Sequence, residues 1–201
     1  AILYYLALPF FYFISLLPFR VLYILSDGLY IILFHVLGYR KEVVYTNLRN
    51  SFPEKTEQEI DRIAKKYYQY LCDLSLETFK TLTISPKSML RHCRFDEKSL
   101  ELFNQLAEQN KSIILVMGHL GNWEWAGNTV SLSCKHKLNV IYHPLSNKHM
   151  DGLMYNMRSR FGSGLIPMKD TFRRMVAERN NLTATAFIAD QTPSYEGTYW
   201  M

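Results

Sequence analysis

Cysteine is scarce in this chain of 201 residues, and the few cysteines form no recognisable pattern. Cys72, Cys93 and Cys134 are an odd number and include no C-x-x-C pair. Disulfide frameworks and zinc knuckles both depend on such pairs, so neither class of protein fits. Reduced thiols on the cytosolic side of a membrane are the simplest interpretation.

The motifs of several common enzyme classes are also lacking. There is no G-x-S-x-G nucleophile elbow, and none of the cysteines carries a catalytic signature. No full set of ligands lies at zinc spacing, which argues against a metal-dependent hydrolase. We therefore expect no metal, no cofactor and no covalent nucleophile.

An excess of charge is missing too. Charged residues make up 20% of the chain and the formal net charge is only +5, with no nucleic-acid-binding motif. A modest positive charge suits anionic partners such as a phosphorylated lipid, a bilayer surface or an acidic carrier protein. Hydrophobic residues reach 48%, so a sizeable core is expected and disorder is not.

The most informative stretch runs from Ser112 to Gly127. The apolar run Ile113–Met117 predicts a buried strand, and Asn122 is a good N-cap for a helix that begins at Trp123. His119 follows the strand, and Glu124 falls in the first helical turn. Across such a turn the two side chains can meet, and a carboxylate on one imidazole nitrogen leaves the other free as a general base. A bare H-x4-E also fits a capped helix with a surface histidine.

The rest of the chain alternates between strand and helix patterns after one long amphipathic helix. A capping box at Thr56 and Glu59 starts that helix, and Pro86 ends its region. The later elements are a weak strand at Leu90–Phe95, helices at Lys98–Glu108, Trp123–Ser133, Asn147–Phe161 and Thr171–Arg179, and strands at Ile113–Met117, Leu138–His143, Leu165–Pro167 and Leu182–Ala189. This order predicts an α/β fold with a mostly parallel central sheet flanked by helices.

Three polar residues each follow the carboxyl end of a predicted strand: His119, His143 and Asp190. Open α/β sheets place their sites at that edge, and three such residues at one edge favour a site more than any one of them alone. His143 taken alone is more typical of a loop histidine, and we assign it no catalytic role.

The N-terminal segment is strongly apolar. Ile2–Leu17 is apolar except for Ser15 and Pro9, and it is slightly short of the about 20 residues that a transmembrane helix needs. Because the chain begins with Ala1, we expect a few residues to precede it. Arg20, Arg40 and Lys41 all come after the apolar run, and the positive-inside rule then puts the remainder of the chain on the cytoplasmic side. Residues 21–37, interrupted by Ser26-Asp27-Gly28, are expected to lie in the membrane interface or over the domain.

Several segments together resemble the lipid A biosynthesis (lauroyl/myristoyl) acyltransferases of the lysophospholipid-acyltransferase superfamily. These segments are His119–Glu124 with its glycines, the Arg40-Lys41…Asn47-Leu48…Phe52-Pro53 linker, Tyr142–Asn147, Met157–Gly162, and Asp190-Gln191-Thr-Pro193. The resemblance covers the chain from its apolar start to Pro193. It implies a glycerol-phosphate-acyltransferase-like fold with an N-terminal membrane-anchor helix over residues 1–37 and an acyltransferase domain over residues 38–201, truncated at its C-terminus.

The resemblance also implies the reaction and its residues. A fatty acyl chain passes from a thioester, with acyl carrier protein as the expected donor, to a hydroxyl of a lipid A precursor or related glycolipid. His119 and Glu124 are the expected catalytic pair. The expected substrate-binding residues are Arg158, Asn122, Arg160, Asp190 and Gln191. The expected location is the bacterial inner membrane, with the domain on the cytoplasmic side and no nucleic-acid partner.

Taken alone, Arg158 equally fits a cation at a helix C-terminus, whereas its planar fork suits an oxyanion or phosphate. Two other functions remain open. One is an acyltransferase acting on another glycolipid, an aminolipid or a glycerophospholipid, because the catalytic pair does not specify the acceptor. The other is a membrane-anchored scaffold that keeps the fold without turnover, which an intact His119–Glu124 pair disfavours.

Overall fold

The computed structural model describes residues 2–191, and these form two compact units that divide between Thr83 and Ile84. The division into a membrane anchor (residues 1–37) and an acyltransferase domain (residues 38–201) stays a prediction. The N-terminal compact unit extends beyond residue 37, to Thr83. Residues 2–83 belong together because the first helices pack on the long helix that precedes Thr83.

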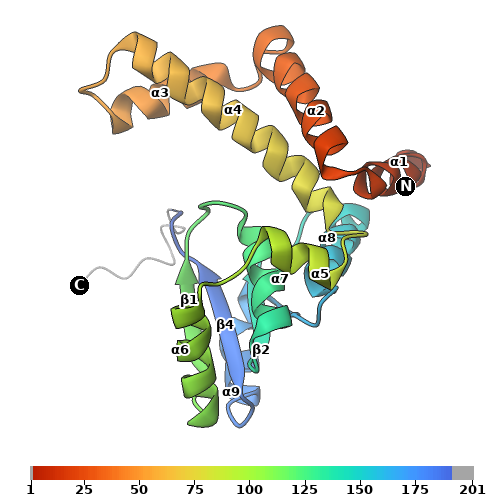
Figure 1. Cartoon of the computed structure of the whole chain (residues 1–201), viewed down its shortest axis with the longest axis vertical. Coiled ribbons are helices and arrows are strands. Elements are labelled where there is room, and N and C mark those ends of the chain that lie inside the picture. Colours follow the sequence, from red (N-terminus) through yellow and green to blue (C-terminus); the bar gives the residue numbers. More distant parts are fainter. Residues whose placement is uncertain (1, 192–201) are drawn as a thin grey trace. The chain divides into compact units, whose positions relative to one another are not determined.

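The first unit is entirely helical over its described residues (Figure 1). Its elements are α1 (Ile2–Leu16), α2 (Phe19–Tyr30), the π-helical continuation η1 (Ile31–Val36), α3 (Lys41–Ser51) and α4 (Glu57–Lys80). The predicted capping box begins α4: the Thr56 hydroxyl accepts from the Glu59 N–H, and the Glu59 carboxylate accepts from the Thr56 N–H. Buried side chains recur along one face of α4, as its amphipathic pattern predicts: Ile60, Ala64, Tyr68, Cys72 and Leu76.

Within residues 2–191, one helix is long and apolar enough to cross a membrane by length and composition. Phe19–Val36 forms an 18-residue span with a mean hydropathy of 1.5, and it is a candidate membrane anchor. The run expected to be the anchor, Ile2–Leu17, forms the shorter α1 of 15 residues. The polar stretch Ser26-Asp27-Gly28 does not end α2. The helix continues through it to Tyr30, and Ser26 is buried.

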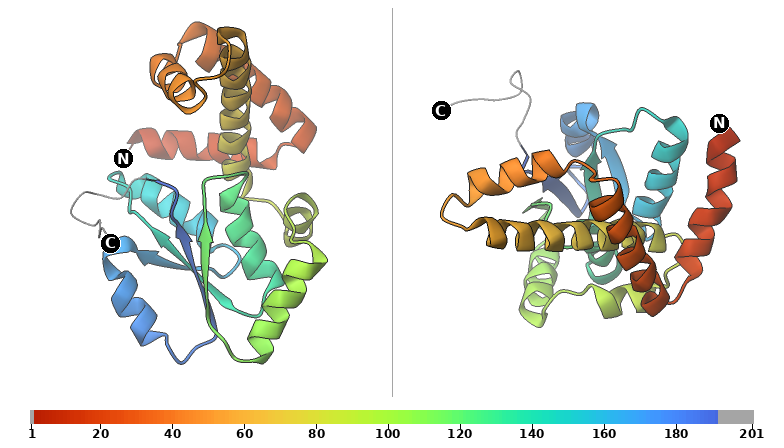
Figure 2. Two further views of the ribbon diagram at one scale, coloured as in Figure 1. Left: turned by 90° about the vertical axis from the view of Figure 1, so that its left-hand side faces the viewer. Right: turned by 90° about the horizontal axis from the view of Figure 1, so that it is seen from above.

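The second unit holds a parallel sheet (Figure 2). Its four strands are β1 (Ile113–Met117), β2 (Lys137–Tyr142), β3 (Gly164–Pro167) and β4 (Thr183–Ile188), in the order β1-β4-β2-β3. The helices of the unit are α5 (Pro86–His92), α6 (Glu97–Glu108), α7 (Trp123–Ser133), α8 (Lys148–Ser159), the short 3₁₀ turn η2 (Met168–Asp170) and α9 (Thr171–Ala177). The predicted α/β class with a parallel sheet is confirmed.

The core of this unit lies on one face of the sheet. Val130 of α7 packs against Leu138, Ala184 and Ala186, and Ile113 and Leu115 extend the cluster along β1. Small alanines on β4 let α7 approach the sheet closely. The register pairs Met117 with Ile188, so β1 and β4 end side by side. The residues that come directly after these two strands are therefore neighbours.

One predicted element of this unit is wrong. Leu90–Phe95 was expected to be a weak strand, but Pro86–His92 is helical. Ser85 caps this helix by accepting from the Ser88 N–H, and Pro86 occupies the first turn, where its missing N–H costs nothing. These local signals outweigh the β-like composition.

Candidate functional site

The site lies at the carboxyl edge of the sheet, where β1 and β4 end. His119 and Asp190 meet there: the imidazole Nδ1 lies 2.7 Å from one carboxylate oxygen of Asp190, and the backbone N–H of His119 donates to the other at 2.7 Å. One carboxylate thus holds both the ring and the main chain of His119. With Nδ1–H as donor, the lone pair of a neutral imidazole is on Nε2.

Two glycines, Gly118 and Gly121, shape the backbone around this contact. A Cβ on Gly118 would lie 3.0 Å from a carboxylate oxygen of Asp190, so a side chain there would displace the carboxylate. Gly121 has φ +61°, which turns the chain into α7 and favours glycine. The two glycines that flank His119 in the sequence therefore keep the contact with Asp190 possible.

The two hydrogen bonds from His119 also set the charge of Asp190. The backbone and side-chain donors of His119 hold the pKa of the Asp190 carboxyl below its ordinary value. A lowered pKa means that these bonds stabilise the fold fully above the ordinary value and are lost as the pH falls through the lower one. The carboxylate is therefore charged at neutral pH.

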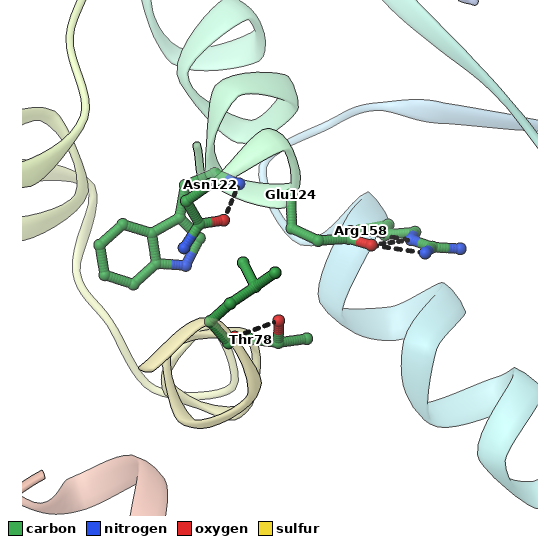
Figure 3. A network of polar contacts seen from close by, with 6 residues as sticks. Thr78, Asn122, Glu124 and Arg158 are labelled. Carbon is green, nitrogen blue, oxygen red and sulfur yellow. Dashed lines mark hydrogen bonds and ion pairs between the residues drawn. The ribbon is translucent and has the colours of Figure 1, made fainter. Parts of the chain in front are cut away.

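Glu124 takes a different partner from the one expected. Its carboxylate binds Arg158 through two nitrogens, with distances of 2.9 Å from Nε and 2.5 Å from Nη2 (Figure 3). The Glu124 and Arg158 side chains are 14% and 26% exposed. Burial lowers the pKa of Arg158, but the bond and the charge of Glu124 outweigh it and the pKa is raised overall.

We expected His119 to bind Glu124. In the structure His119 binds Asp190, and Glu124 binds Arg158. The planar fork of Arg158 matches a carboxylate, and this pairing satisfies Glu124 without the imidazole. Both His119 and Glu124 nevertheless line one cavity, and Arg158 lines it with them. The catalytic roles of His119 and Glu124 stay predictions, but their hydrogen-bond partners differ from the expected ones.

The cavity has a volume of about 420 Å³ and is largely apolar. Four methionines contribute to its wall, and unbranched thioether side chains adapt easily to a flexible apolar ligand: Met117, Met150, Met154 and Met168. The lining also includes the polar side chains of His119, Glu124 and Arg158. Such a cavity accommodates a long apolar chain with a reactive polar end.

The other predicted site residues are divided between the cavity and its surroundings. Gln191 lines the cavity. Asn122 caps α7, with its side-chain oxygen accepting from the Trp125 N–H at 3.0 Å (Figure 3). Arg160 lies away from the cavity lining and donates to the backbone oxygen of Ile84 at 2.6 Å. Pro193 of the predicted closing segment lies outside the described residues.

Three features of the site were not predicted. Asp190 was expected to bind substrate, and its place after a strand was the only signal that it also meets His119. The Trp123 ring stands edge-on to the imidazole, with ring centroids 4.8 Å apart. Asn128 lines the cavity one helical turn after Glu124, and its buried Oδ1 has no partner among the described residues. Asn128 could have been predicted from its spacing, because residues i and i+4 of a helix share a face and Glu124 is four residues earlier.

No group of three or more histidine, cysteine, aspartate or glutamate side chains within residues 2–191 is arranged to hold a metal ion. The site thus consists of an oriented imidazole, an arginine–carboxylate pair and an apolar cavity.

Comparison with known proteins gives the family. No curated protein matches the chain. The family model of the bacterial lipid A biosynthesis acyltransferases matches residues 1–198, which is nearly the whole sequence. This match agrees with the resemblance of the separate motifs, and it joins both compact units in one family. The chain therefore belongs to the bacterial lipid A biosynthesis acyltransferase family.

Proposed function

We propose that this protein transfers a fatty acyl chain from an acyl thioester, carried by acyl carrier protein, to a hydroxyl group of a lipid A precursor. The observation that carries the proposal is the oriented His119 in the lining of a largely apolar cavity. A base beside a cavity suited to an acyl chain is what O-acylation of a hydroxyl requires. Family membership supports the acyltransferase class and lipid substrates.

In the proposed reaction, Nε2 of His119 accepts the proton of the acceptor hydroxyl as its oxygen attacks the thioester carbonyl. Asp190 holds Nδ1–H and stabilises the imidazolium that forms, so its role is positioning. The tetrahedral intermediate then collapses, the carbon–sulfur bond breaks, and the proton passes to the departing thiolate. A thioester is already activated, so no covalent acyl-enzyme is required.

Arg158 is the proposed group for the developing negative charge. Glu124 holds two of its guanidinium nitrogens, which fixes the plane of the fork beside the cavity. The third nitrogen, Nη1, is a further donor of the group, and it suits an oxyanion or a substrate phosphate. In this proposal Glu124 contributes by orienting Arg158 and by its charge, and it does not need to touch the imidazole.

The experiment is an acyl-transfer assay with the protein in membranes. Labelled acyl chains are supplied on acyl carrier protein or on coenzyme A, and a lipid A precursor is compared with a glycerophospholipid and an aminolipid as acceptor. We expect label in the lipid A precursor with acyl carrier protein as the better donor. Label only in another acceptor would replace the acceptor assignment, and transfer to none would favour the scaffold function.

A further inference from the structure

The lining of the cavity includes a polar group that the proposed reaction does not use, the side-chain amide of Asn128. The residue is only 3% exposed, and its Oδ1 atom is buried without a hydrogen-bond partner. Its Nδ2 atom also makes no hydrogen bond among residues 2–191. The other buried side-chain atom without a partner in that range is Nδ1 of His136, which lies outside the lining of this cavity. Leaving a buried amide unpaired disfavours a state roughly tenfold or more, so Asn128 needs an explanation.

Other polar side chains in the lining are already paired with partners other than Asn128. The Glu124 carboxylate is held by Arg158 through two nitrogens. The hydroxyl of Ser163, which also lines the cavity, shares a hydrogen bond of 2.7 Å with the hydroxyl of Ser131. A partner for the Asn128 amide is therefore expected to come from a molecule that enters the cavity.

The position of Asn128 on α7 indicates which part of a ligand it meets. Helix α7 follows β1 and precedes β2, and both strands run parallel to β4. The helix must therefore run from the carboxyl edge of the sheet back towards its amino edge. Glu124 lies in its first turn, and Asn128 follows on the same face, about 6 Å further from the carboxyl edge. Since His119 lies at that edge, Asn128 is on the inner side of the proposed reaction centre.

The part of the substrate on that inner side is the acyl chain. In the proposed transfer the thioester carbonyl lies beside His119, its carrier arm extends outward from the sheet edge, and the acyl chain extends inward. The inner wall also contains Gly127, Val140 and Ala186, which offer no polar side-chain atom. A plain hydrocarbon chain would leave the Asn128 amide unpaired. A hydroxyl group on the chain both donates and accepts, so it can pair with either end of the amide.

We propose that Asn128 makes the cavity selective for an acyl chain that carries a hydroxyl group near its carbonyl end. The inference rests on the proposed function, because it takes this cavity as the site of the acyl chain. A site that hydrogen-bonds a substrate hydroxyl rejects the analogue without it, since the buried polar group of the protein is then left unpaired. Asn128 is in this role a specificity-determining residue, and His119 and Arg158 keep the roles already given to them.

The first test measures binding by the full chain, with isothermal titration calorimetry of three free acids: dodecanoate, 3-hydroxydodecanoate and 12-hydroxydodecanoate. The wild type should bind 3-hydroxydodecanoate roughly tenfold more tightly than the other two, because only its hydroxyl reaches the amide. Asn128→Leu, which is similar in size and has no polar atom, should bind all three alike. Asn104→Leu, at an exposed position of α6, should keep the wild-type preference.

Equal binding of the three acids by the wild type would overturn the proposal and would indicate that water satisfies the amide. This comparison needs no variant, so it decides the question even if Asn128→Leu does not fold. A preference that persists in folded Asn128→Leu would also overturn it.

The second test measures transfer of the same three chains from acyl carrier protein to a lipid A precursor. The wild type should show a kcat/KM roughly tenfold higher for the 3-hydroxylated chain, and folded Asn128→Leu should transfer all three chains with similar kcat/KM. A binding preference without any transfer would contradict the proposed function and support the selection by Asn128. Transfer of all three chains by the wild type with equal kcat/KM and equal affinity would overturn the selection and leave the proposed function standing.

Discussion

The two compact units differ in where they keep their polar and apolar groups. In residues 2–83 the helices α1 and α2 leave many large apolar side chains exposed, such as Leu6, Phe13 and Ile24, while Ser15 and Ser26 are buried. In residues 84–191 the arrangement is the more familiar one, with an apolar core on one sheet face and charged side chains gathered at the strand ends. The units therefore differ in where their exposed apolar surface and their clustered polar groups lie.

Because the two units differ, substitutions in each should change a different property. Substitutions at the strand ends should change turnover and leave membrane attachment intact. Substitutions within residues 2–83 should change stability or attachment and leave the chemistry of bound substrate intact. A single substitution that changed both turnover and membrane attachment would contradict this division of roles.

The largest effect is expected for His119→Ala. General-base catalysis contributes about 10²–10⁴-fold, and acyl transfer should fall by that order. Membrane attachment should not change, since His119 lies at the strand ends. His149→Ala, on the first turn of α8 and outside the cavity lining, is the matched control and should keep near-normal turnover. Wild-type transfer by folded His119→Ala would remove the proposed base.

Arg158→Lys should have the next largest effect. Lysine keeps the charge but loses the fork that binds Glu124 through two nitrogens, and one charge-assisted hydrogen bond lost corresponds to about a tenfold to hundredfold fall in turnover. Arg94→Lys makes the same exchange at an exposed position of the same unit and should be silent. Equal turnover of the two variants would indicate that Arg158 only stabilises the C-terminus of its helix.

Lys80→Met should have the smallest effect and act in the other unit. The ammonium donates to the carbonyl oxygens of Ser15 and Leu17 at the end of α1, and burial lowers the pKa of Lys80. Losing these bonds while relieving a buried charge should cost about 1–2 kcal/mol of unfolding free energy. Hydrogen exchange should increase in α1 and α4, and not in the sheet. Lys66→Met, at an exposed position of the same helix, should exchange like the wild type.

Much of the fold could be predicted because its signals are local. The strand Ile113–Met117 and the helix Trp123–Ser133 were predicted with their observed bounds, since an unbroken apolar run and an Asn122 cap fix both ends. The Thr56–Glu59 capping box was predicted for the same reason. Leu90–Phe95 was missed where an N-cap and a first-turn proline outweighed composition.

The site was less predictable because its contacts join distant residues. Asp190 and His119 are brought together by the β1–β4 pairing, and strand order cannot be read from spacing. The H-x4-E spacing made Glu124 the natural partner of His119. Arg158, which arrives from α8, supplies a better donor geometry for that carboxylate than one imidazole nitrogen can. The residues were found from the sequence, and their pairing needed the fold.

The central claim is that Asp190 orients the imidazole of His119, and its most direct test is the protonation of the two ring nitrogens. Nitrogen-15 NMR at neutral pH can be compared for the wild type, Asp190→Asn and Glu124→Gln. The account predicts a proton held on Nδ1 in the wild type and in Glu124→Gln, and no such preference for Nδ1 in Asp190→Asn. A mixture in Glu124→Gln, with Asp190→Asn unchanged, would contradict it.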